Sequence, residues 1–238
     1  MPRFFIDKKQ VTNGQIRILG GDAKHIGVLR MNPGDAITAA DGGHVYSCLI
    51  GSVRKDEVVA NIVETTAVDT EPGVAVTLFQ GIPKAAKMEI IIQKAVELGV
   101  REIVPVVTER SIPAPGGNKV ERWCKISEAA AKQSNRGIVP RIGAPVNLER
   151  AARMFEGLDE CYVAWELEKE ISASAVFSAS RGKTVGIVIG PEGGFSNEEI
   201  STLRQYKIVT FSLGRRILRA ETAGFAALIC LMMHRGEF

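Results

Sequence analysis

The sequence predicts an α/β fold with a parallel sheet, preceded by a smaller β-rich module. Two observations carry this prediction. Strand-like and helix-like segments alternate from about residue 74 onward, which is typical of a parallel sheet covered by helices on both faces. Before that point only short β-like runs occur, and the chain changes character at 65–73, Thr-Thr-Ala-Val-Asp-Thr-Glu-Pro-Gly. We therefore expect two domains, 1–70 and 71–238.

The first domain is expected to contain four short strands joined by tight turns. Asp41-Gly42-Gly43 has the composition of a hairpin turn, because aspartate and glycine tolerate the required backbone angles. The expected strands are Gln15–Leu19, Ala36–Ala40, Val45–Ile50 and Val58–Val63.

The second domain is expected to alternate strands with helices. The strands are Val74–Gln80, Glu102–Val107, Cys161–Trp165, Thr184–Ile189 and Ile208–Phe211. The helices are Lys84–Leu98, Lys119–Ser134, Asn197–Gln205 and Arg219–Met233. Ser196 and Glu199 have the spacing of a capping box at the start of the third helix. The Pro-Ala-Pro-Gly-Gly stretch at 113–117 predicts a mobile surface loop.

Composition limits the function classes. The 238 residues carry 45% hydrophobic residues and a net charge of +3, which permits a nucleic-acid partner without requiring one. The four cysteines lie far apart with no C-x-x-C pair, so neither a disulfide framework nor a metal site is indicated. The N-terminus is charged too early for a signal peptide, and Arg219 and Glu221 interrupt the late apolar stretch. We expect a cytoplasmic protein without a membrane segment.

The first informative motif is the turn Gly190-Pro191-Glu192-Gly193-Gly194, which follows a buried-strand pattern. Such a strand–loop–helix junction is where α/β proteins commonly place ligands. Glu192 adds a negative charge that disfavours a phosphate and is compatible with a neutral or cationic ligand. A Walker loop ending at Lys183-Thr184 would need glycine at Phe177, and a nucleophile elbow at Ser196 would need glycine at Glu198. Both motifs are excluded.

The second motif is Leu213-Gly214 followed by the segment 215–223, Arg-Arg-Ile-Leu-Arg-Ala-Glu-Thr-Ala. Arg219 and Glu221 stand in otherwise apolar surroundings. Because a buried charge needs a partner, we expect each to meet an ion-pair partner or a polar ligand. Two such turns after neighbouring strands favour a pocket built from backbone over glycines that only make turns.

These residues resemble a known family. The two C-terminal motifs, together with several upstream blocks in the same order, are similar to the RsmE branch of the SPOUT methyltransferases, which methylate N3 of a uridine in small-subunit ribosomal RNA. The resemblance covers nearly the whole chain, and only about 145–180 matches loosely. The blocks are Arg3-Phe4-Phe5, His25–Arg30, Gln93–Val100, Arg122-Trp123, Ala129–Arg136, Pro140, Ile189–Ser196 and Leu213–Ala223.

The resemblance implies a PUA-like β-barrel that helps to hold RNA, and a SPOUT-type parallel sheet ending in a trefoil knot. It implies S-adenosylmethionine as cofactor, 16S rRNA within the small ribosomal subunit as substrate, and a homodimer in which both subunits contribute to each site. Carried onto this chain, the cofactor-binding residues are Gly190, Pro191, Gly194, Leu213, Gly214, Ile217, Leu218 and Ala223. The sulfonium of that cofactor agrees with the tolerance for a carboxylate at Glu192.

The implied reaction requires uridine N3 to lose a proton before it attacks the methyl group. The expected catalytic residues are Arg219, Arg136 and Glu221. Arg136, Arg219 or Lys94 could stabilise the deprotonated base, while Glu97, Glu221 or water could take the proton, and the sequence leaves this choice open. N3 lies on the base-pairing edge, so a paired target must first be exposed.

The residues expected to bind RNA lie in the N-terminal module and along 119–136, where phosphate contacts would make binding salt-sensitive. They are Arg3, His25, Arg30, Arg122, Gln133 and Arg136. Three alternatives stay open: a catalytically silent RNA-binding protein, a nucleotide-dependent enzyme, and a methyltransferase acting on another RNA or on a ribose 2′-hydroxyl. The absence of a G-x-G-x-x-G motif or a P-loop counts against the second.

Overall fold

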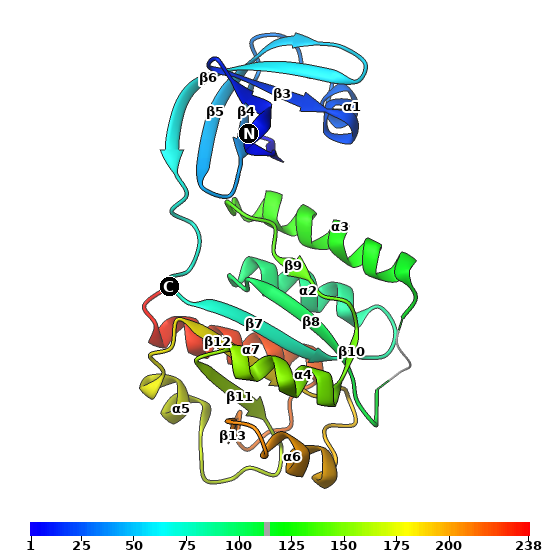
Figure 1. Cartoon of the computed structure of the whole chain (residues 1–238), viewed down its shortest axis with the longest axis vertical. Helices are drawn as coiled ribbons and strands as arrows, with labels where there is room; N and C mark the ends of the chain where they lie inside the picture. Colours follow the sequence, from blue (N-terminus) through cyan, green and yellow to red (C-terminus); the bar gives the residue numbers. More distant parts are fainter. Residues whose placement is uncertain (112–114) are drawn as a thin grey trace. The chain divides into compact units, whose positions relative to one another are not determined.

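The computed structural model describes residues 1–111 and 115–238. These residues divide into two compact units, which Figure 1 draws in sequence colours. Unit 1 comprises Met1–Glu71 and Ala131–Val139, and unit 2 comprises Pro72–Ala130 and Pro140–Phe238. The surface loop expected at 113–117 falls partly on residues 113 and 114, which lie outside the described residues.

Unit 1 is built on a six-stranded sheet with the order β1-β4-β5-β6-β3-β2, antiparallel except for the parallel pair β1 and β4. Inward-facing side chains such as Phe4, Ile16 and Ile37 are fully buried in its core. Asp41 makes the expected turn, since its Oδ1 accepts the Gly43 and His44 amides at 2.9 and 2.7 Å. The strands are β1 (Arg3–Phe5), β2 (Val11–Thr12), β3 (Gln15–Leu19), β4 (Ala36–Ala40), β5 (His44–Val53) and β6 (Glu57–Ala67).

Unit 1 also contains the helix α1 (Gly20–Val28) and the short 3₁₀ helix η1 (Lys8–Gln10), which sequence reasoning missed. α1 begins with two glycines, of which Gly20 has a φ of +63°. Only Ala23 and Ile26 of this helix are buried. Two glycines and a two-residue apolar face give no helical signal, so packing rather than propensity maintains α1.

Unit 2 contains the predicted parallel sheet, and every recorded strand pair in it is parallel. Its seven strands follow the order β10-β8-β7-β12-β11-β13, with β9 paired to β8. The strands are β7 (Ala75–Gly81), β8 (Glu102–Val107), β9 (Arg141–Ile142), β10 (Val146–Asn147), β11 (Glu160–Ala164), β12 (Thr184–Ile189) and β13 (Val209–Phe211).

Helices cover both faces of this sheet. α2 packs on α7 and α7 on α5, whereas α4 packs on α6. Alternation along β11 separates the two layers, because Val163 joins the core under α4 and α6, while the Tyr162 ring meets Phe177 of α5 at 5.4 Å. The helices are α2 (Lys87–Glu97), α3 (Gly117–Gln133), α4 (Leu148–Met154), η2 (Phe155–Gly157), α5 (Ala173–Ala179), α6 (Asn197–Leu203) and α7 (Ala220–His234).

The parallel arrangement brings the carboxyl ends of three neighbouring strands to one edge. β11 ends at Ala164, β12 at Ile189 and β13 at Phe211, and Ala164 pairs directly with Phe211. The loops after these strands therefore start side by side. No helix within the described residues is long and apolar enough to cross a membrane, and the same residues contain no cluster of three or more side chains suited to hold a metal ion.

Candidate cofactor site

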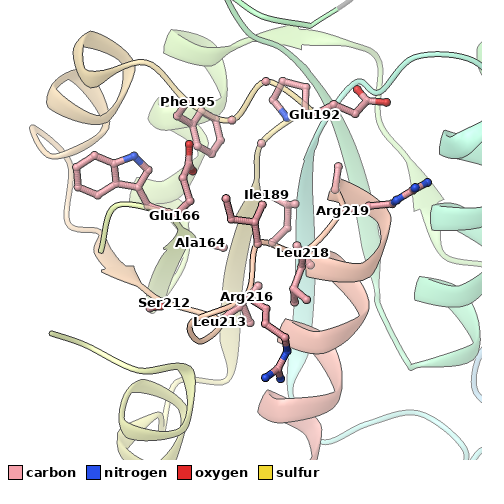
Figure 2. Close-up of a pocket in the computed structure, with 18 of the residues that line it drawn as sticks. Ala164, Glu166, Ile189, Glu192, Phe195, Ser212, Leu213, Arg216, Leu218 and Arg219 are labelled. Carbon is pink, nitrogen blue, oxygen red and sulfur yellow. The ribbon is translucent and has the colours of Figure 1, made fainter. Parts of the chain in front are cut away.

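A cavity of about 520 Å³ opens at this edge, and Figure 2 shows the three loops that enclose it. They are 164–166 after β11, 189–195 after β12, and 212–219 after β13, the last continuing into α7. The structure brings all eight residues expected to bind the cofactor to its lining: Gly190, Pro191, Gly194, Leu213, Gly214, Ile217, Leu218 and Ala223. Arg219, expected to be catalytic, also lines it.

The first loop is a tight turn in which two glycines lie close to neighbouring atoms. The Gly194 amide donates to the Pro191 carbonyl at 3.0 Å, and Gly194 has a φ of +65°. A Cβ on Gly194 would lie 2.4 Å from Glu166 Oε1, and one on Gly190 would lie 3.3 Å from the Gly194 backbone. The loop thus presents bare backbone to the cavity because side chains would fill it.

Gly81 at the end of β7 is a further requirement of this turn, and sequence reasoning missed it. A Cβ there would lie 2.6 Å from the nitrogen of Pro191 and 2.9 Å from the carbonyl carbon of Gly190. The first loop therefore crosses β7 in direct backbone contact. The available signal was a glycine that ends a strand next to a loop rich in glycine.

The far end of the first loop is fixed by the predicted capping box. Ser196 Oγ accepts the Glu199 amide at 3.2 Å, and Glu199 Oε2 accepts the Ser196 amide at 3.0 Å. Glu199 Oε1 also accepts the Glu109 amide at 2.8 Å, and Arg110 Nη1 donates to the Gly193 carbonyl at 2.8 Å. The segment after β8 thereby holds the loop in place.

The negative charge of Glu192 is neutralised by other residues of the chain. Its carboxylate accepts a hydrogen bond from Lys87 Nζ at 2.8 Å and approaches the Lys84 amide at 3.2 Å. Burial acts to raise the pKa of Glu192, but these hydrogen bonds outweigh it and the pKa is lowered. The carboxylate that is expected to disfavour a phosphate ligand is thus paired with Lys87 of the same chain.

Glu166 is the acidic residue whose carboxylate lies next to the first loop. It follows β11 and lines the cavity, as Figure 2 shows, and a Cβ on Gly194 would lie 2.4 Å from its Oε1. Sequence reasoning missed Glu166 because it lies in the loosely matching stretch 145–180. Its position directly after a buried strand, at the same edge as the two glycine-rich turns, was the usable signal.

The second loop is more open than the first. Ile217 is 88% exposed, whereas Leu213 and Leu218 are partly buried against the cavity. Gly214 has a φ of +106° with open space around it, so its backbone angle rather than crowding requires glycine. The loop offers apolar side chains and backbone to a ligand.

The two predicted charges beside this loop have different surroundings. Arg219 is exposed at the N-cap of α7, so the expectation that it is buried was wrong; the loop lies at the surface. Glu221 is partly buried and lies 3.6 Å from Lys87 Nζ, which matches the expected ion pairing. Its carboxylate is absent from the lining of the cavity as the described residues define it.

Arg136 is placed in unit 1, not in the lining of the cavity. It is 3% exposed and its guanidinium pairs with Glu71, whose Oε1 also accepts the Gly137 amide at 2.9 Å. Arg136 thus belongs to unit 1, whereas Arg219 lines the cavity of unit 2. Lys94 and Glu97, the other candidates, pair with each other at 2.8 Å on α2 and do not line the cavity either.

The residues expected to bind RNA divide into two groups. Arg3 donates to the backbone carbonyls of Asn135 and Arg136, the latter at 2.9 Å, and Arg122 pairs with Glu89 at 2.8 Å. The other group comprises His25, Arg30 and Gln133, whose side chains are exposed. Phe4 is fully buried, so it belongs to the core and is not a stacking surface for bases.

Two family models match different parts of the chain. The family model for an RNA methyltransferase domain matches residues 70–232, and that for an RNA methyltransferase PUA domain matches residues 18–63. Ribosomal RNA small subunit methyltransferase E of Bacillus subtilis is 37% identical over 242 residues, covering 96% of this chain and 94% of that protein. The enzyme of the same name from Aquifex aeolicus is 33% identical, covering 89% and 91%.

Two solved structures with a bound ligand are also similar. Ribosomal RNA small subunit methyltransferase E from Neisseria gonorrhoeae, bound to S-adenosyl methionine, is 28% identical with a TM-score of 0.88 and covers 98% of this chain and 97% of its own. A methyltransferase from Legionella pneumophila in complex with the same cofactor is 29% identical with a TM-score of 0.85, covering 97% and 96%.

Proposed function

This chain belongs to the ribosomal RNA small subunit methyltransferase E family, and we propose that it transfers the methyl group of S-adenosylmethionine to N3 of a uridine in 16S rRNA. One observation carries the proposal. All eight residues expected to bind the cofactor line a single cavity, although they come from two loops that are separated in the sequence. Its volume of about 520 Å³ suits a small-molecule ligand.

The residues of the cavity fit this cofactor. Gly190 and Gly194 expose backbone groups that can hydrogen-bond an adenine edge, and Leu213 and Leu218 supply an apolar surface. The carboxylate of Glu166 is compatible with a positively charged sulfur. When bound, S-adenosylmethionine supplies a methyl group activated by that sulfonium.

The chain's own contribution to the chemistry is positioning and charge. Removing the N3 proton leaves a negative charge on the uracil, and in this proposal Arg219, which lines the cavity, stabilises that charge. Glu221 or water takes the proton in this proposal. Arg136, if it acts in the reaction, must do so from outside this cavity lining, so Arg219 is the better supported of the two.

The proposal extends to how the RNA is held. Unit 1, with exposed His25 and Arg30, is the part proposed to bind 16S rRNA within the small ribosomal subunit. Arg3, Arg122, Gln133 and Arg136 remain proposed RNA contacts. A homodimer, a trefoil knot at the C-terminal segment, the 1–70 and 71–238 division of roles, and a cytoplasmic location belong to the same proposal.

Titration calorimetry with S-adenosylmethionine tests the first step, and incubation with undermethylated small subunits followed by mass spectrometry of the RNA tests the second. Binding together with a new N3-methyluridine supports the proposal. Binding with 2′-O-methylation or another product would keep the cofactor site and replace the target. Absence of binding would return the chain to the class of RNA-binding proteins without activity.

A further inference from the structure

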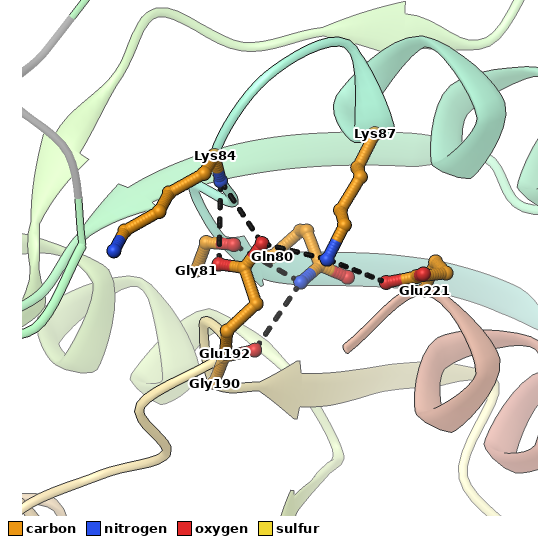
Figure 3. Close-up of polar contacts among 7 residues, drawn as sticks. All are labelled: Gln80, Gly81, Lys84, Lys87, Gly190, Glu192 and Glu221. Carbon is orange, nitrogen blue, oxygen red and sulfur yellow. Dashed lines mark hydrogen bonds and ion pairs between the residues drawn. The ribbon is translucent and has the colours of Figure 1, made fainter. Parts of the chain in front are cut away.

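Lys87 is the first residue of α2 and reaches into the space between the two cofactor loops. Its side chain is 29% exposed and lines the cavity. Figure 3 shows the ammonium group between two carboxylates, with Nζ 2.8 Å from Glu192 Oε1 and 3.6 Å from Glu221 Oε2. Glu192 belongs to the first loop and Glu221 to the helix that follows the second. One cation thus contacts both sides of the cofactor site.

The Glu192 side of this contact holds a strained connection. Both oxygens of Glu192 lie 3.2 Å from the Lys84 amide, three residues before Lys87. Between Lys84 and Lys87 in the sequence lies Ala85, whose φ is +56°. This left-handed conformation is costly for any residue with a Cβ. Such a conformation persists only where surrounding contacts enforce it. The Glu192 carboxylate, bonded on both sides of Ala85, supplies those contacts.

The Glu221 side depends on Lys87 for its charge balance. Glu221 Oε2 is buried and accepts no hydrogen bond from the residues that the structure describes, so the ion pair with Lys87 is its recorded polar contact there. Glu221 also lies in the first turn of α7, where the helix dipole favours a negative charge. The dipole explains why an acidic residue is tolerated but not why it is directed at Lys87.

Beneath this cluster the same elements already meet through a buried amide. Gln80 is fully buried, and its Nε2 donates to the Gly81 carbonyl at 3.0 Å and approaches the Gly190 carbonyl at 3.5 Å. A Cβ on Gly224 of α7 would lie 3.5 Å from Gln80 Oε1. Gln80 therefore fixes where β7, the first loop and α7 converge, and Lys87 joins the two loops above that point.

We propose that Lys87 is a positioning residue that couples the two cofactor loops, holding Glu192 and Glu221 at the separation that binds S-adenosylmethionine. The inference rests on the proposed function for the identity of the ligand. Lys87 acts through the two carboxylates and not by contact with the methyl group or the base. The hydrogen bond with Glu192 raises the pKa of Lys87, so the ammonium keeps its charge throughout the neutral range.

The test measures the dissociation constant of S-adenosylmethionine by calorimetry, together with the melting temperature of the ligand-free protein. Lys87→Met is expected to weaken binding about tenfold, because the loops lose their shared cation. Lys87→Arg keeps the charge and is expected to stay within about twofold of the wild type. Glu192→Gln is expected to weaken binding about threefold. Arg141→Met removes a more exposed ion pair, with Glu102, away from the cavity and serves as the control for loss of a surface cation.

A double-mutant cycle separates positioning from direct contact. If Lys87 acts through Glu192, the loss caused by Lys87→Met must shrink when Glu192 is already glutamine. An undiminished loss in that background would overturn the proposal, because Lys87 would then contact the cofactor itself. So would wild-type affinity in Lys87→Met with a lowered melting temperature, which would make Lys87 a stability residue only. If Lys87→Met does not fold, unchanged affinity in Glu192→Gln overturns it. Failure of the wild type to bind would instead refute the proposed function.

Discussion

The glycine loops of unit 2 and the arginines assigned to RNA were predicted from the same sequence, but their partners in the structure differ in kind. The loops meet around one cavity, with all eight residues expected to bind the cofactor in its lining. Arg136, Arg3 and Arg122 are engaged by Glu71, by backbone carbonyls and by Glu89. Backbone geometry is encoded locally by glycine, whereas the role of a cation depends on which distant carboxylate the fold brings to it.

The largest effect is expected from filling the cofactor cavity. Gly194→Arg places a long side chain where even a Cβ would lie 2.4 Å from Glu166 Oε1, at a backbone φ of +65°. S-adenosylmethionine affinity should fall by more than about 100-fold, measured by calorimetry. Gly194→Ala should be milder, because the Glu166 carboxylate can move aside.

Gly157→Arg is the matched control for this change, since Gly157 has open space around it. It should bind the cofactor as the wild type does. If Gly194→Arg is folded by circular dichroism and binds S-adenosylmethionine normally, the cofactor must bind elsewhere. The glycine loops would then be no better predicted than the arginines assigned to RNA.

Arg136 tests the arginines that the sequence assigned to RNA. Its side chain is 4% exposed and pairs with Glu71, so Arg136→Ala leaves a carboxylate without its main partner and should cost about 3 kcal/mol of unfolding free energy. Chemical denaturation monitored by circular dichroism measures the loss, and Glu71→Gln should lower stability in the same direction. An unchanged stability with a flatter salt dependence of RNA binding would return Arg136 to the RNA surface.

The sequence was sufficient where the signal is local. β3, β4, β8 and β12 have the predicted bounds because their apolar patterns are continuous and closed by turn residues. The capping box of Ser196 and Glu199 needs only four consecutive residues. These features involve no partner that is distant in the chain.

The remaining features depend on tertiary contacts. Glu166, Gly81 and Lys87 matter only because parallel strands bring their ends to the edge where the glycine loops begin. The apolar neighbours of Arg219 predicted burial, but those neighbours line an open loop and Arg219 is exposed. The helix α1 begins with two glycines and is maintained by packing. Neither periodicity nor composition reports such contacts.

Arg219 connects the two groups of residues, because it is an arginine that lies in the second cofactor loop. It lines the cavity, and no ion pair is recorded for it among residues 1–111 and 115–238. Arg219→Ala should lower kcat about tenfold by removing a positive charge beside the reacting base, with little change in melting temperature. Methyl-transfer assays under saturating cofactor measure this. A large drop in melting temperature with normal turnover would make it a structural residue.

The smallest effect is expected at Arg122. Its side chain either serves only the intramolecular ion pair with Glu89 or contacts an RNA phosphate, and the two roles can be distinguished directly. Its side chain is 67% exposed and pairs with Glu89, so Arg122→Ala should change stability by no more than about 0.5 kcal/mol. If Arg122 exchanges Glu89 for an RNA phosphate, the slope of log K against log salt falls by about 1. Glu89→Gln then provides the opposite change, because it frees Arg122 and should strengthen RNA binding. Filter binding over a salt series measures both, and identical slopes for the wild type and Arg122→Ala would show that an exposed cation on α3 serves only its intramolecular partner.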